Sequence, residues 1–469
     1  MKHVTVPLHE IAYLMFFVTF LGVRGLGTYA EPYMTAAFYL SAGFFLLKVL
    51  LTEHTVTEYL MIVLFTALGI CISISSGNRG LLLFFMMMIG MKAVHVKRVY
   101  AAGALLLGSC MVLQTTIHTL GIRTGYFTPN RDLYRFGLGY FNPNATQYTF
   151  LVLAMMILYL QKEKDLARQI LTCALLFTSS SYLYLYTASR AAHYVLILYL
   201  LLHLWLSKGP LHKLTMCLAA VSSYAVTILC MVIAVLRNVE TQTANTLLNR
   251  FSNAAYAWNH FPLTLFGRDI YVLGHECDMA QMYLLMGCGI IAFLLVNAIT
   301  VRYLVYCIRH DLWAELSIVS SMLLMGLMEA LLYNYSFRNI CFILFGGMLY
   351  ALLPHRDAPV HRILPLKGQL NIPHTLLKRF SLTNRRILAL TALFAAVALA
   401  GFVTARQLYP ARGTYLLAGM GETVEITGEN ALLEYTRRQL SMGVSAATVT
   451  VLAVYAAQCY NAGRKQARS

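Results

Sequence analysis

Five arginines are the residues best suited to chemistry in this chain, because each stands in a polar break between long apolar segments. A guanidinium stays charged at physiological pH and presents a planar fork of donors, so it binds phosphate or carboxylate through two hydrogen bonds. We expect these side chains to bind an anion such as a diphosphate. They are Arg135, Arg190, Arg250, Arg268 and Arg338.

Three further residues are candidates for proton transfer. His275 is the first choice for a general base, since histidine titrates near neutral pH. Glu329 is the one carboxylate deep in a predicted membrane span, either as a functional group or as a buried partner of an outer arginine. Asp278 is the third candidate. The outer loops show no Asp-x-Asp pair and no metal-ligand cluster, so we predict no metal and no other cofactor.

Membrane helices must hold these residues in place. Hydrophobic residues make up 59% of the 469-residue chain and charged residues only 12%, about half the charged share of soluble domains. This composition excludes a soluble enzyme. Crossing the hydrocarbon core takes about 20 mostly apolar residues, and segments of this kind recur along the chain. Fourteen are centred within 13–23, 38–51, 60–73, 81–91, 101–116, 150–160, 171–184, 194–206, 217–236, 283–298, 318–333, 340–352, 388–403 and 444–455. We predict an all-α polytopic membrane protein of about 14 helices.

The net charge of +17 divides into two populations once the chain is placed in a membrane. With the N-terminus inside, 22 of the 36 basic residues lie on the inner side, as the positive-inside rule requires. The 14 outer basic residues are all arginine, whereas all 11 lysines lie inside. A single outer arginine is often only a snorkelling side chain or the partner of a carboxylate such as Asp132, Asp269 or Asp278. Fourteen together indicate that something on the outer side uses their charge.

Two long outer loops are predicted to carry the site. The first, 121–147, ends in Asn-Pro-Asn, a turn that caps the next helix. The second, 237–279, has apolar residues at helical spacing over 246–260, which predicts an amphipathic interfacial helix holding Arg250 at headgroup depth. Some aromatic side chains here fit an interfacial belt. The residues we predict to contact glycan are Tyr140, Asn142, Asn144, Tyr186 and Trp258.

These motifs, in this order, resemble those of bacterial O-antigen and capsule polymerases, the Wzy family. The segment RFGLGYFNPN at 135–144 is similar to their R-x-x-x-G-[FY]-x-[HN]-P-N segment, and TASR at 187–190 to the T-x-S-R element that follows. Arg250 with LFG at 265–267 resembles their arginine-to-LFG loop. His275, Asp278, Tyr283 and Gly287 are similar to the entry into the next span. The resemblance covers roughly residues 1–353.

The resemblance has consequences for fold and chemistry. The superfamily includes the O-antigen ligases (WaaL), and both groups share a polytopic glycosyltransferase fold of the C type. It implies metal-independent transfer of glycan from undecaprenyl diphosphate to a sugar hydroxyl on the outer face, with Arg190 and Arg250 on the diphosphate and His275 activating the acceptor. The chain then divides into a membrane domain at 1–353, a basic cytoplasmic connection at 354–386 and a C-terminal helix hairpin with an outer loop at 387–469.

Four functions fit a polytopic chain of this kind. A polysaccharide polymerase is the leading hypothesis, and a ligase differs from it only in the acceptor. A flippase or transporter of lipid-linked oligosaccharide would show repeated halves with a midplane site, and neither is apparent. A structural scaffold leaves the outer arginines unexplained. Predicted partners are undecaprenyl-diphosphate-linked oligosaccharide, membrane lipid, a flippase and a chain-length regulator, without nucleic acid. The predicted location is the bacterial cytoplasmic (inner) membrane, with both termini cytoplasmic.

Overall fold

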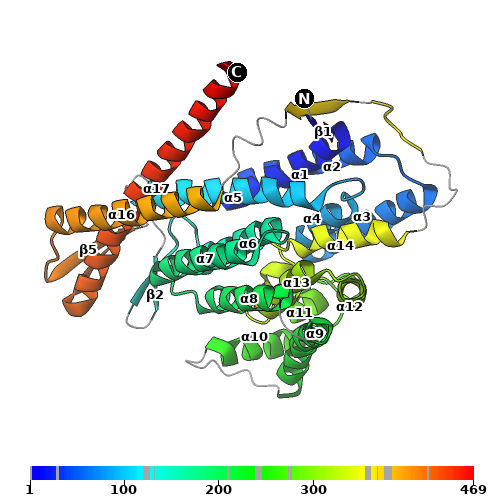
Figure 1. Ribbon diagram of the computed structural model, residues 1–469. Coiled ribbons are helices and arrows are strands. Elements are labelled where there is room, and N and C mark those ends of the chain that lie inside the picture. The colour runs from blue at the N-terminus through cyan, green and yellow to red at the C-terminus, as the bar shows by residue number, and fades with distance from the viewer. Residues whose placement is uncertain are drawn as a thin grey trace.

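The fold is a stack of apolar helices (Figure 1). The computed structural model describes residues 3–27, 31–119, 127–130, 133–208, 212–237, 246–272, 274, 277–353, 361–366, 368–373, 383–419 and 422–468. Within these ranges, ten helices are long and apolar enough to cross a membrane. They are α1 (Leu8–Gly25), α2 (Glu31–Leu51), α3 (Val56–Ser76), α5 (Val96–Thr119), α7 (Leu166–Thr187), α8 (Arg190–Lys208), α9 (His212–Arg237), α12 (Ile290–Arg309), α16 (Asn384–Leu408) and α17 (Gly428–Arg468). The chain is thus a mainly helical, multi-pass membrane protein.

The other four predicted spans contain helices that do not meet the same measure of length and apolarity. They are α4 (Gly80–Ile89), α6 (Pro143–Gln161), α13 (Trp313–Met325) and α14 (Cys341–Leu352). Every residue of α4 is buried, as is nearly every residue of α6 and α13. α13 packs against α6, α8, α9, α12 and α14. Lipid would also accommodate an apolar helix, so it is the burial of these helices by their neighbours that places them at the centre of the bundle.

Two of the predicted spans are interrupted. The predicted span 283–298 begins in a π-helical turn η1 (Tyr283–Gly287), which follows the short helix α11 (Ala280–Met282), and continues in α12 after a break. Gly289 has a φ of 94°, and a Cβ atom there would lie 2.3 Å from the backbone nitrogen of Gly267. The loop at Leu265–Gly267 therefore packs directly against the backbone at Gly289, and a side chain at that position would prevent this contact. Apolar composition does not reveal this break, since both sides of it are equally hydrophobic.

The predicted span 318–333 also ends early. α13 stops at Met325, and an extended residue, Glu329, precedes the 3-10 turn η2 (Ala330–Leu332). Glu329 therefore lies in a non-helical segment that is packed inside the protein, with the side chain 11% exposed. Irregular backbone at membrane depth is tolerated only where protein or a cavity surrounds it. The expectation of a carboxylate within a continuous helix was wrong in this respect.

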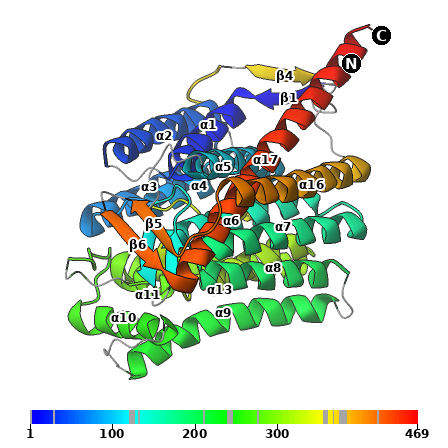
Figure 2. The same ribbon diagram turned by 90° about the vertical axis from the view of Figure 1, so that its left-hand side faces the viewer.

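Three short antiparallel strand pairs supplement the helices, so the all-α description is incomplete. β1 (His3–Pro7) pairs with β4 (Gln369–Pro373), β2 (Phe127–Asn130) with β3 (Leu133–Phe136), and β5 (Thr414–Gly419) with β6 (Glu422–Thr427). The 354–386 connection thus contains a strand that returns to the N-terminus. The C-terminal outer loop is a hairpin at the shared end of α16 and α17, which cross each other (Figure 2).

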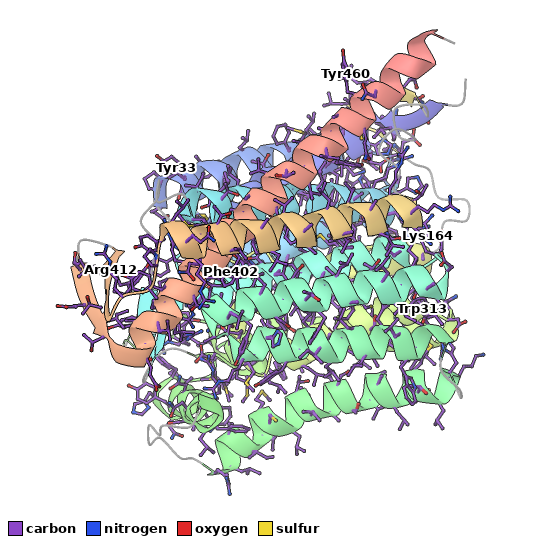
Figure 3. The ribbon with its side chains drawn as sticks, turned by 60° about the vertical axis from the view of Figure 1, so that its left-hand side comes forward. Tyr33, Lys164, Trp313, Phe402, Arg412 and Tyr460 are labelled. Carbon is purple, nitrogen blue, oxygen red and sulfur yellow. The ribbon has the colours of Figure 1, made fainter. Side chains whose placement is uncertain are left out.

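The ion pairs test the division of the loops into two sides. The ion pairs between predicted loop positions join residues predicted on the same side. Arg250 also pairs with Glu329, which was predicted within a span. Lys97–Glu163 and Lys162–Glu315, each 2.5 Å, link three inner connections. Figure 3 shows Tyr33 and Arg412, both predicted outside, at one end of the stack, with Lys164 and Trp313 at the other. The fold therefore gathers the two loop sets at separate ends.

A buried histidine at the inner end gives the fold a dependence on pH. His54 lies between α2 and α3, and its pKa is lowered from 6.5 by burial and by the charge of Lys92, against the opposing effect of Glu58. The folded state therefore binds fewer protons than the unfolded state just below pH 6.5, so stability falls as the pH drops through that value. We expect a loss of about 1 kcal/mol between pH 7.5 and 5.5. Thermal unfolding in detergent measures it, and the variant His54→Gln should show a smaller change between the two pH values.

Candidate functional site

A hydrogen-bonded chain of polar side chains connects separate segments at the predicted outer end. Arg135 on β3 donates from Nε to the carbonyl oxygen of Thr187 at 2.8 Å and from Nη2 to Oδ1 of Asn144 at 2.6 Å. Asn144 in turn donates from Nδ2 to Oε1 of Glu329 at 2.9 Å. The Asn142 side chain caps α6 and fixes the first turn, which carries Asn144. The N-terminus of α6, the β2–β3 hairpin and the break after α13 thus meet at one place.

Arg250 continues the chain from the other side. It lies on α10 (Thr246–His260), the helix that the sequence predicted with the same bounds. Its guanidinium bridges two carboxylates, with Nη2 3.5 Å from Oε1 of Glu329 and Nη1 in close contact with Oδ2 of Asp278. Asn253, one turn along α10, donates to the same Asp278 oxygen at 3.3 Å. The three charged side chains are all largely buried, at 16%, 13% and 11% exposed for Arg250, Asp278 and Glu329.

The electrostatics show that three of the predicted arginines act on one another. Burial lowers the pKa of the Arg135 guanidinium, the carboxylate of Glu329 opposes this shift, and the positive charges of Arg190 and Arg250 lower the pKa further. Arg190 is exposed and is the first residue of α8. Two residues before it, Ala188 has a φ of 44°, which turns the chain between α7 and α8. Three guanidiniums with two carboxylates leave this cluster with a positive charge. A cluster of this kind attracts an anion that reaches it from the outer face.

A second layer of buried polar groups holds Arg135 in place. Thr187, whose carbonyl accepts from Arg135, donates its hydroxyl to Oε1 of Gln147 at 3.4 Å. Gln147 donates to Oγ of Ser180 at 2.6 Å, and that hydroxyl lies 2.8 Å from Nδ1 of His193. All of these side chains are buried. Because unpaired polar groups in a buried site cost free energy, this chain fixes the junction of α6, α7 and α8 in one arrangement.

The C-terminal helix α17 contributes to the same scaffold, a role that the sequence did not indicate. Arg437 donates to the carbonyl oxygen of Tyr134, the residue before Arg135, at 3.1 Å. The carbonyl oxygen of Arg437 accepts from the hydroxyl of Tyr186, the residue before Thr187, at 2.6 Å. α17 therefore contacts both neighbours of the Arg135–Thr187 hydrogen bond. The outer loop predicted within the 387–469 hairpin consists largely of the β5–β6 hairpin, between the end of α16 and the first turns of α17.

The other two predicted anion-binding arginines have different surroundings. Arg338 is 2% exposed, inside the segment that follows Glu329. Arg268 lines a separate small cavity and stacks over the ring of Phe261, with Cζ 5.3 Å from the ring centroid. Among the described residues, Arg268 has no hydrogen bond or ion pair with Arg135 or Arg250. His275, the first choice for the base, lies outside the described residues.

Of the predicted glycan contacts, only the two asparagines belong to the cluster. Tyr140 is fully buried and donates its hydroxyl to the carbonyl oxygen of Gly25 at 2.8 Å. Tyr186 is 4% exposed and donates its hydroxyl to the carbonyl oxygen of Arg437. Neither ring faces the surface in this structure, and their glycan contacts stay predictions. Trp258 packs its ring against the core of the bundle.

Asn253 is the cluster residue that the sequence analysis passed over. It lies three positions after Arg250 on the predicted amphipathic helix, a spacing that places both side chains on one face. This spacing was the sequence signal that could have placed Asn253 beside Arg250 in the site. Within the described ranges, no three His, Cys, Asp or Glu side chains come together as a metal-binding group. Comparison with protein-family models, with curated proteins and with solved structures gives no match.

Proposed function

We propose that this protein is a surface-polysaccharide polymerase that joins undecaprenyl-diphosphate-linked repeat units at the outer face of a bacterial cytoplasmic membrane. The observation that carries the proposal is the convergence of Arg135, Arg190 and Arg250 at the predicted outer end. The motifs that resemble the polymerase family include all three of these residues. Both termini lie on the cytoplasmic side in this arrangement.

The chemistry of the cluster suits a diphosphate leaving group. In the proposed reaction, the hydroxyl oxygen of the incoming repeat unit attacks the anomeric carbon of the growing chain. The bond from that carbon to the diphosphate breaks, and undecaprenyl diphosphate carries away the electron pair. Fixed guanidiniums stabilise the charge that develops on the leaving oxygen, and they need no rearrangement when they are already held in position. The carboxylates of Glu329 and Asp278 hold Arg250 in this way.

The base that accepts the hydroxyl proton belongs to the proposal as well. The resemblance assigns this role to His275. Glu329 and Asp278 both contact Arg250, which favours an orienting role for them over proton transfer. With Asn144 donating to the same Glu329 oxygen as Arg250, that oxygen already accepts two donors.

The direct test uses purified protein and lipid-linked repeat units from the same strain. We expect a ladder of glycans that grow by whole repeat units, unchanged by a metal chelator. A single elongated product on a different acceptor lipid, without a ladder, would instead identify a ligase. Movement of the lipid-linked unit across a vesicle membrane without any new glycosidic bond would identify a flippase, and either result would overturn the polymerase proposal.

A further inference from the structure

A small polar cavity lies beside the cluster at the predicted outer end. Its volume is about 250 Å³. Three short pieces of chain enclose it, namely the turn between α3 and α4, the loop after α10 and the π-helical turn η1. The lining residues are Ser76, Gly77, Asn78, Arg268, Asp269, Ile270, Tyr271 and Tyr283. Arg268 was predicted to bind the diphosphate, whereas in the structure it lines this cavity, apart from Arg135 and Arg250.

Contacts with neighbouring residues hold the lining residues of the cavity in position. Gly77 turns the chain with a φ of 70°, and Asn78 accepts from the backbone nitrogen of Gly80 at 2.7 Å. Asp269 accepts from the backbone nitrogen of Tyr271 at 2.9 Å, which fixes the loop. The guanidinium of Arg268 rests over Phe261. Since these contacts fix the lining residues, the cavity is already formed in the absence of any ligand.

The lining carries opposite kinds of hydrogen-bonding group together with aromatic rings. Nε of Arg268 is buried and has no acceptor among the described residues. A guanidinium only donates, an ionised carboxylate such as that of Asp269 only accepts, and a sugar hydroxyl does both. The rings of Tyr271 and Tyr283 lie 6.0 Å apart, with Tyr271 39% exposed and Tyr283 2% exposed. Tyr271 therefore offers a ring face and edge to a ligand, while Tyr283 forms the floor.

We propose that this cavity binds one neutral pyranose ring of the acceptor glycan, a role that rests on the proposed function. The carboxylate of Asp269 beside Arg268 disfavours a phosphate group, and the polar lining disfavours a lipid chain. The volume is smaller than the roughly 300–1,000 Å³ of pockets that enclose drug-sized ligands, so one sugar ring fits and a longer glycan must continue outside.

The cavity is mechanically connected to the charged cluster. Asp278, which contacts Arg250, and Tyr283, which lines the cavity, are five residues apart on the segment that contains α11 and η1. Two non-helical steps of about 3.3 Å and three helical steps of about 1.5 Å put the two positions no more than about 11 Å apart along that segment. A sugar in the cavity is therefore held close to the proposed diphosphate site at Arg250. The acceptor must lie this close, because its hydroxyl attacks the carbon that carries the diphosphate.

The first test measures sugar binding without any reaction. The full-length protein in detergent is titrated with the methyl glycosides of the common bacterial hexoses, 6-deoxyhexoses and N-acetylhexosamines, and saturation-transfer NMR detects contact. We expect at least one glycoside to bind, Tyr271→Ala to weaken that binding about tenfold, and the adjacent exposed Val272→Ala to leave it unchanged. Equal binding by wild type and Tyr271→Ala, or no binding by any glycoside, would overturn the proposal.

The second test separates this site from the proposed function. In the polymerisation assay, Tyr271→Ala should raise the KM for the acceptor about tenfold and leave the affinity for inorganic pyrophosphate unchanged. An unchanged KM contradicts the acceptor role even if the ladder forms. A wild-type protein that binds the methyl glycosides but forms no ladder contradicts the polymerase function and leaves the sugar site standing.

Discussion

Arg250→Lys should lower polymerising activity and the affinity for pyrophosphate by about 100-fold while the protein still inserts and folds. The guanidinium reaches Glu329 and Asp278 at the same time through two different nitrogens. A lysine keeps the charge but has a single ammonium on a flexible stem, so it cannot bridge both carboxylates and also face a diphosphate. The measurements are isothermal titration with pyrophosphate and the rate of ladder formation.

The matched control for this change is Arg237→Lys, an exposed arginine near the same end of the bundle. It makes the same chemical replacement outside the cluster and should leave activity and pyrophosphate affinity at the wild-type level. Thermal unfolding of both variants separates a loss of binding from a loss of fold. Wild-type turnover by Arg250→Lys would exclude a role for the guanidinium fork in holding the leaving group.

Arg437→Met should have the largest effect on stability of any single change at the outer end. The side chains of Arg437 and Glu434 pair at 2.6 Å and are 9% and 5% exposed. Removing one partner of a buried pair leaves the other charge without compensation, which costs about 3–5 kcal/mol. The variant also removes the donor to Tyr134, next to Arg135. Thermal unfolding in detergent measures the loss.

A double variant distinguishes stabilisation from positioning. Arg437→Met combined with Glu434→Leu removes both charges, so most of the lost stability should return. We expect the double variant to bind pyrophosphate about tenfold more weakly than wild type, because the carbonyl of Tyr134 still lacks its donor and β3 is less well fixed. Wild-type affinity in the stable double variant would show that α17 contributes stability alone.

The sequence predicted the helices well because each is defined by a local property, a run of apolar residues. It also predicted α10 with its bounds, since an amphipathic period is visible in one short stretch. The division of the basic residues between two membrane sides stays a prediction. The interruptions after Gly287 and Met325 were missed. They depend on glycine contacts and on packing between segments that are distant in the chain, which no local pattern reports.

The sequence by itself determined a multi-pass membrane chain and a set of arginines with the chemistry to bind an anion. The tertiary structure alone decided which of them share a site. Arg135 and Arg250 are 115 positions apart in the chain. Arg250 contacts Glu329 directly, and Arg135 is connected to it through Asn144. Arg268 lines a separate cavity, and Arg437 contacts the backbone next to Arg135. The physical reason is that the type of a side chain fixes what it can bind, whereas its partners are fixed by contacts between segments that meet only in the folded bundle.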